Sequence, residues 1–60
     1  MELVLNNQYR ERATGRVVDL IVITELPTGD VWIAFRKPDH HQEFTITAEQ
    51  FKRDFEPLAS

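Results

Sequence analysis

The chain has 60 residues, and its ten acidic side chains outnumber seven Lys and Arg, so the formal net charge is −3. The absence of cysteine excludes a disulfide framework and, with two histidines, a closed structural zinc site. The longest apolar run, residues 20–23, is far shorter than the ~20 residues that span a bilayer, and the start lacks the basic and apolar regions of a signal peptide. We therefore expect a single domain over residues 1–60, located in the cytoplasm, with no membrane association.

The first half of the chain predicts two strands joined by a turn. A short apolar segment at residues 3–5 leads into turn-prone asparagines at 6–7, and residues 8–12 then suit a short strand. Gly15, which takes a positive φ without steric cost, marks the following turn. Residues 16–24 contain five β-branched aliphatic side chains, the strongest strand signal in the sequence.

Two further strands are predicted next. Residues 26–29 match a type I turn, since Pro27 occupies its second position and a glycine its fourth. Residues 31–36 then return as a strand antiparallel to the preceding one. Pro38 ends this strand because proline donates no ladder hydrogen bond. Residues 43–47 alternate strictly between apolar and polar side chains, which predicts a strand with one buried and one solvent-exposed face.

A short helix is predicted after the fourth strand. Thr47 and Gln50 have the spacing of a capping box, in which the threonine caps the helix and the glutamine reaches back. Phe51 and Phe55 are four residues apart and therefore share one helical face. Pro57 ends the helix, and a last short extended segment follows it.

These elements predict a mainly β fold, namely a small SH3-like barrel of about five antiparallel strands with a short C-terminal helix. Closing the sheet hides the edges that a small domain without disulfides must protect. The side chains expected in the core lie on the inner face of the strands and the helix: Tyr9, Val18, Leu20, Val22, Val31, Ile33, Phe35, Phe44, Ile46, Phe51 and Phe55.

Alternation leaves an apolar surplus on the outer face. Trp32 faces outward if its two strand neighbours face inward, and the same rule places several apolar side chains of the preceding strand outside. Contiguous exposed apolar patches mark interfaces, and tryptophan is enriched at binding hot spots. We therefore predict a protein-binding surface formed by Trp32, Ile21, Ile23 and Val17. Two alternatives stay open: a bulge or barrel bend turns Trp32 inward, or residues 3–5 cover the face.

Basic side chains suggest an alternative function. They flank the first turn and end the third strand, and a barrel built from hairpins brings both groups near Tyr9 or Trp32. Basic groups hold phosphates, and an aromatic ring stacks on a base. The alternative nucleic-acid site is therefore Arg10, Arg12, Arg16, Arg36 and Lys37 with Tyr9. The net charge of −3 argues against a general nucleic-acid binder.

We expect no catalytic or cofactor site. Asp39, His40 and His41 form the one metal-like grouping, but neighbouring strand residues point to opposite faces, so the imidazoles converge only in an irregular loop. A nucleophile with a base and an orienting group is not recognisable, and two isolated glycines make no phosphate-binding loop. The expected protein is non-enzymatic, with no metal and no cofactor.

Several short motifs resemble a known group of proteins. They are Tyr9-Arg10-Glu11-Arg12, Gly15-Arg16-Val17-Val18, Phe35-Arg36, and Phe51 with Phe55-Glu56-Pro57-Leu58. Over residues 9–58 this pattern resembles small bacteriophage and prophage proteins that adopt SH3-like barrels. The motif that opens the second strand is also similar to the start of KOW and Tudor-type barrels, which bind nucleic acid or peptide tails.

The resemblance implies an accessory protein of a phage or another mobile element that acts by binding a host protein, including components of host defence. A second copy of the chain, in a homodimer, is the other expected partner. This expected function follows from analogy of fold and context, and not from an identified binding or catalytic site. The predicted function is therefore a protein-interaction module, with a small nucleic-acid-binding barrel as the alternative.

Overall fold

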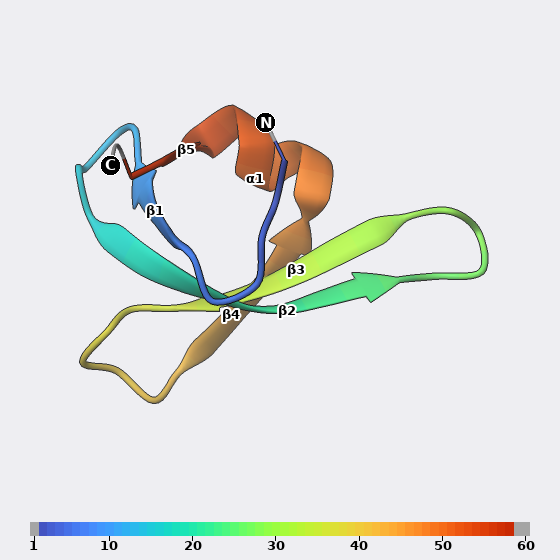
Figure 1. Cartoon of the computed structure of the whole chain (residues 1–60), viewed down its shortest axis with the longest axis horizontal. Helices are drawn as coiled ribbons and strands as arrows, with labels where there is room; N and C mark the ends of the chain where they lie inside the picture. Colours follow the sequence, from blue (N-terminus) through green and yellow to red (C-terminus); the bar gives the residue numbers. More distant parts are fainter. Residues whose placement is uncertain (1, 59–60) are drawn as a thin grey trace.

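The computed structural model describes residues 2–58, which form one antiparallel sheet and one short helix. The elements are β1 (Gln8–Glu11), β2 (Val17–Glu25), β3 (Val31–Arg36), β4 (Glu43–Thr47), α1 (Ala48–Asp54) and β5 (Phe55–Pro57). The sheet order is β4-β3-β2-β1-β5, so the last strand returns beside the first. Figure 1 shows the curved sheet, with α1 near β1 and β5 and the β2–β3 hairpin projecting away from them.

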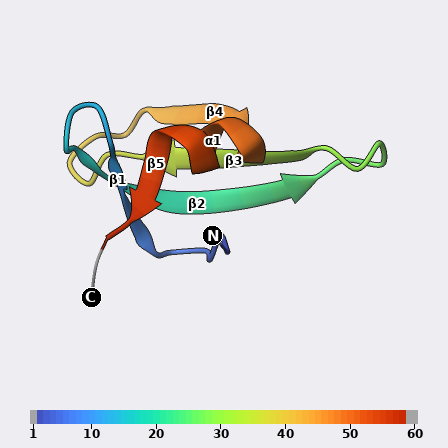
Figure 2. The same cartoon turned by 90° about the horizontal axis from the view of Figure 1, so that it is seen from above.

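The mainly β prediction is confirmed, whereas the predicted closure of the sheet is absent from the described part of the chain. There, β4 and β5 are the two edges of one open sheet. The helix α1 contacts β3, β4 and β5 and covers part of one sheet face. Figure 2 shows α1 between β5 and β4, over β3. We call the face that α1 covers the inner face.

Local signals predict most element bounds well. β3 and β4 have the expected limits, β1 ends one residue earlier than predicted, and β2 begins and ends one residue later. The turn before β3 is also confirmed, since the Gly29 N–H donates to the Leu26 carbonyl at 2.9 Å. Gly29 has a φ of 92°, in the left-handed region. The hairpin loop is therefore of the three-residue type in which a type I turn is followed by one left-handed residue.

The helix begins as predicted but ends earlier. The Thr47 hydroxyl accepts a hydrogen bond from the Gln50 N–H at 3.1 Å, which confirms the N-cap. The prediction that the helix continues to Pro57 is wrong, because Phe55 already has extended angles (φ −123°, ψ 157°). A residue before proline is restricted to extended conformations, so Glu56 favours the strand that pairs with β1.

The core is aromatic and centres on Phe51. Its ring stacks on Phe55 at 4.4 Å, meets Tyr9 edge-on at 5.2 Å and lies 5.8 Å from Phe35. Leu3, from the segment before β1, also packs against this core. Six predicted core side chains are buried, namely Tyr9, Val18, Leu20, Ile33, Phe51 and Phe55, while Val31, Phe35 and Ile46 pack partly buried against them.

Two predicted core residues are exposed instead, Val22 at 44% and Phe44 at 39%. The cause for Val22 is a bulge in β2, where Leu20 pairs with Phe35 but Val22 already pairs with Ala34. The extra residue shifts the alternation of everything after it, so Val22 turns outward. Phe44 does lie on the inner face, but it sits at the start of β4, whereas α1 begins at the opposite end of that strand.

Candidate functional site

Trp32 lies on the outer face, as predicted, and is 37% exposed. Its register partners are Thr24 in β2 and Thr47 in β4, so the tryptophan stands between two threonines. The next row across the same three strands consists of uncharged side chains as well. We call these two rows the Trp32 face: Val22, Thr24, Trp32, Ala34, Thr45 and Thr47.

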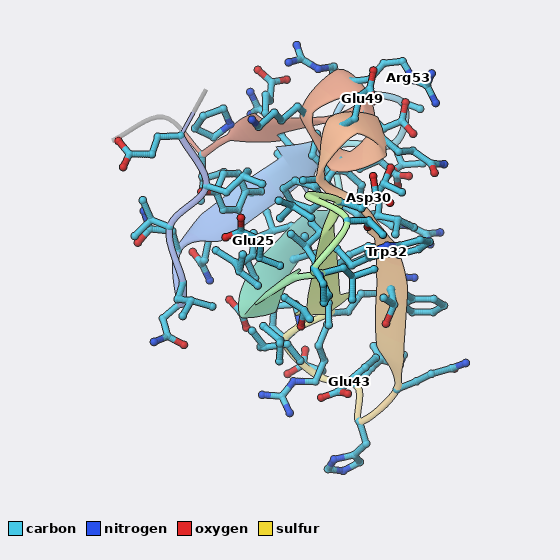
Figure 3. All side chains as sticks on the ribbon, turned by 90° about the vertical axis from the view of Figure 1, so that its right-hand side faces the viewer. Glu25, Asp30, Trp32, Glu43, Glu49 and Arg53 are labelled. Carbon is cyan, nitrogen blue, oxygen red and sulfur yellow. The ribbon has the colours of Figure 1, made fainter. Side chains whose placement is uncertain are left out.

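Charged side chains begin one row further along the sheet. Arg36 pairs with Asp19 in β2 and with Glu43 in β4, which places opposite charges on both sides of the arginine. Figure 3 looks at the molecule from the side of the β2–β3 hairpin, with Trp32 in the middle, Asp30 next to it, and Glu49 and Glu43 above and below. The Trp32 face is therefore an uncharged patch with charged side chains at its border.

The residues predicted to accompany Trp32 do not all join it. Ile23 pairs with Ile33 and packs against the core, so the prediction that it faces outward is wrong. Ile21 is the extra residue of the bulge, and Val17 pairs with Arg10 near the other end of β2. Val22 faces outward in place of Ile23. The sequence contains a hint of this exchange, because residues 20–23 are an unbroken apolar run. Such a run fits either alternation frame.

Neither alternative reading of Trp32 holds. The bulge exists, but it lies in β2 and changes the faces of Val22 and Ile23 while Trp32 stays outside. The segment at residues 3–5 runs on the other side of the sheet, because Leu3 packs against the inner-face core. On the outer face, Trp32 and Val22 are therefore the exposed large apolar side chains of the Trp32 face, and Ala34 between them is buried.

A second apolar feature lies on the inner face, where sequence reasoning expected filled core. It is a groove of about 300 Å³ beside the exposed ring of Phe44, which stacks on Phe35 at 5.7 Å. Its apolar lining comes from Val18, Phe35, Phe44, Ile46 and Phe55. We call this feature the phenylalanine groove. It exists because a helix of seven residues is too short to cover the whole inner face.

The predicted basic residues divide into separate groups. Arg10 approaches Glu56 at 3.6 Å, and Arg36 stands between two carboxylates in register. Arg16 and Lys37 do come together, since both line the phenylalanine groove and an adjoining hollow of about 510 Å³. Arg12 is exposed after the end of β1.

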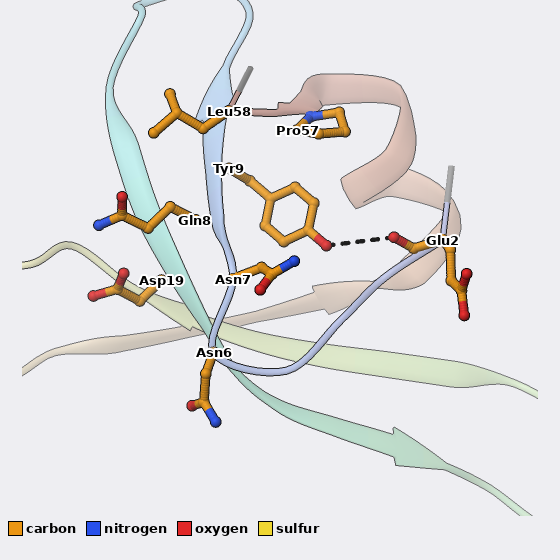
Figure 4. Close-up of a pocket in the computed structure, with 8 residues that line it drawn as sticks. All are labelled: Glu2, Asn6, Asn7, Gln8, Tyr9, Asp19, Pro57 and Leu58. Atoms are coloured by element: carbon orange, nitrogen blue, oxygen red, sulfur yellow. Dashed lines mark hydrogen bonds between the residues drawn. The ribbon is translucent and has the colours of Figure 1, made fainter. Parts of the chain in front are cut away.

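Tyr9 lies in the core, 2% exposed, and so presents no free ring face to a nucleic-acid base. Its hydroxyl accepts a hydrogen bond from the Val4 N–H at 2.9 Å and donates to the Glu2 carbonyl at 3.4 Å. Figure 4 shows this ring pointing toward the segment before β1. Tyr9 thus fastens that segment to the domain.

The loop from Lys37 to Glu43 holds the histidines. Asp39, His40 and His41 are all exposed there. Within residues 2–58, His, Asp and Glu side chains form no group of three able to hold a metal ion. The same residues include no helix long and apolar enough to cross a membrane.

Comparisons with family models, with curated proteins and with solved structures found no match for this chain. The resemblance to small phage proteins with SH3-like barrels therefore stays a prediction based on the short motifs alone.

Proposed function

We propose that this chain is a non-enzymatic protein-interaction module that binds its partner through the Trp32 face. The observation that carries the proposal is a 37% exposed tryptophan on the middle strand of an uncharged two-row sheet surface. The cores of protein interfaces are rich in aromatic residues and poor in charge, and their rims are polar. The Trp32 face has this distribution, since it is uncharged itself and is bordered by the row of Arg36 at one end and by the exposed Asp30 at the hairpin end.

The rigidity of the surface supports the same function. Thr24 and Thr47 belong to strands on either side of β3, so the backbone around the tryptophan is held by two ladders. A preorganised surface loses little conformational freedom on binding, which leaves more of the contact energy as affinity. Tryptophan truncation at interface centres commonly costs at least ~2 kcal/mol of binding free energy.

The partner that we propose is a host protein, and the chain is then an accessory protein of a phage or another mobile element. This part rests on the resemblance of the short motifs. A binding module that occupies a host protein needs a stable surface but no catalytic group. Inhibition of a host system is the proposed outcome of that occupation.

The test is affinity capture from a host-cell lysate with the wild type and with Trp32→Ala. Phe44→Ala is the matched control, because it also removes an aromatic ring, 39% exposed, but from the inner face. We expect specific preys with the wild type and the Phe44 variant and their loss with Trp32→Ala, while circular dichroism shows three folded proteins. Equal capture by all three proteins would contradict the proposal.

We further propose that the fold is an SH3-like barrel in a partly open form. The strand order supports this, since β5 returns beside β1 and the helix stands between β4 and β5. The bulge in β2 adds bend and twist to the middle of the sheet. Phe44 and Phe55, from the two edge strands, line one groove. Solution NMR contacts from the Phe35 ring to both the Phe44 and the Phe55 rings test the proposal, and a flat sheet without them would contradict it.

Nucleic-acid binding is the weaker candidate. Of the predicted set, Arg16 and Lys37 line a common hollow, but Arg10 and Arg36 lie beside carboxylates and Tyr9 is buried. Each phosphate contact should contribute roughly one unit to the slope of log affinity against log salt. A protein without measurable affinity for DNA or RNA at low salt would exclude this function.

A further inference from the structure

β4 is an edge strand with few of the features that normally protect an edge, since Glu43 is its one charged side chain. Within residues 2–58 it pairs with β3 alone, and its five residues keep an unbroken register with that neighbour. Natural edge strands are protected by very short length, charged side chains (lysine above all), proline, bulges or a covering segment. β4 contains neither proline nor lysine, and Glu43, Phe44 and Thr45 are exposed. Its outer row of backbone N–H and C=O groups is available to another strand.

The opposite edge of the sheet is protected. β5 has only three residues and ends in Pro57, which has no N–H to offer a further strand. The short length and the proline are two of the usual protective features. Of the two edge strands of the described sheet, β4 is therefore the one that is open to a further strand.

We propose that β4 pairs antiparallel with β4 of a second copy of this chain, around a two-fold axis at Thr45. An axis there pairs all five residues: Phe44 meets Ile46 of the partner subunit, and Glu43 meets Thr47 of the partner subunit. An axis at Phe44 or Ile46 would pair only three residues of the strand. An axis between residues would oppose an inner-face residue to an outer-face one and is excluded by the alternation.

The contacts in this register are mutually compatible. Glu43 faces a threonine rather than a second carboxylate, so no like charges are opposed across the five pairs. Phe44, 39% exposed in the single chain, is covered on the inner face by an isoleucine. A two-fold interface uses the same patch on both subunits and closes after two copies, which prevents unlimited growth.

The pairing would also join the surfaces described above. Thr45 belongs to the Trp32 face, so the Trp32 faces of the two copies become one continuous outer surface across the axis. On the inner side, Phe44 and Ile46 bring the two phenylalanine grooves side by side. This proposal uses the β4 edge and does not rest on the proposed function of Trp32.

The first experiment measures solution mass from micromolar to millimolar concentration. We expect the wild type to change from its chain mass of 7.0 kDa to twice that mass, and Thr45→Lys to stay monomeric, because it opposes two positive charges at the axis. Thr24→Lys is the control, since it adds the same charge to an exposed threonine of the same face but away from the edge. Mixing Thr45→Lys with Thr45→Glu should restore the dimer as a mixed species.

A second measurement uses the absence of cysteine from the chain. In Thr45→Cys the two thiols lie directly opposite, roughly 4.5–5.5 Å apart between Cβ atoms, so mild oxidation should cross-link two copies rapidly. Thr24→Cys should cross-link much more slowly. Trp32→Ala should still double in mass, which separates this pairing from association through the Trp32 face.

Three results would overturn the proposal. The first is a wild type that stays monomeric, which leaves the edge to an extended segment of another protein. The second is a dimer that survives Thr45→Lys, and the third is equal cross-linking at positions 45 and 24.

Discussion

Truncating Phe51 and Phe44 separately tests the description of the core. The sequence predicts both side chains in the core, but the structure places them in different environments. Phe51 is fully buried and its ring lies within 5.8 Å of Tyr9, Phe35 and Phe55. Phe44 is 39% exposed and stacks on Phe35 alone among the described aromatic pairs. The perturbation is Phe51→Ala against Phe44→Ala.

The expected losses of unfolding free energy differ severalfold. Phe51→Ala removes a fully buried ring and leaves a cavity, at a cost of about 3–5 kcal/mol. Complete burial of a phenylalanine contributes ~1.5–3 kcal/mol, and about six-tenths of Phe44 is removed from water, so Phe44→Ala should cost about 1–2 kcal/mol. A single core of this size supplies roughly 3–5 kcal/mol in total. Phe51→Ala should therefore be largely unfolded at room temperature.

Urea unfolding followed by far-ultraviolet circular dichroism measures both effects. Phe51→Leu serves as a variant that still folds, with an expected loss of roughly 1–2 kcal/mol. The slope of free energy against urea should stay constant if only the folded state changes. Equal losses for Phe51→Ala and Phe44→Ala would refute the assignment of Phe51 to the centre of the core and of Phe44 to the groove.

Two further substitutions test the β2 bulge and the segment before β1. Val22→Asp should leave the chain folded and Ile23→Asp should unfold it, because the bulge turns Val22 to solvent and Ile23 to the core; similar urea midpoints for the two would contradict the bulge. Tyr9→Phe should lower the unfolding free energy by about 0.5–1.5 kcal/mol through loss of the hydroxyl that accepts from the Val4 N–H. It should also speed amide exchange at residues 2–5 selectively, and unchanged exchange there would show that the hydroxyl does not hold the segment.

Elements with strong local signals could be predicted from the sequence. Pro27 and Gly29 specify a turn within four residues, and Thr47 caps a helix through its own hydroxyl. The helix end could not be predicted in the same way. Phe55 is four residues from Phe51, which is the spacing of one helical face, yet it belongs to β5. Its extended conformation follows from pairing with β1, which comes from the other end of the sequence and is not visible in the residues around Phe55.

The candidate site could be predicted only in part. Alternation in β3 correctly placed Trp32 outside, because no irregularity interrupts that strand in its pairing with β4. The neighbours of Trp32 could not be assigned, since β2 carries a bulge within an apolar run that fits two alternation frames. The phenylalanine groove was missed because the extent of cover by α1 depends on the path of the helix across the sheet.

The return of β5 to β1 has a consequence for the order in which the chain folds. β1–β2, β2–β3 and β3–β4 are joined by short connections, whereas β1 and β5 come from opposite ends of the sequence. Closing a long loop costs entropy before its contacts compensate, so we expect the hairpins to form first and β5 to dock last. Because Phe55 opens β5 and stacks on Phe51, that docking also completes the aromatic core. During synthesis the domain therefore acquires its stability only after residues 55–57 have left the ribosome.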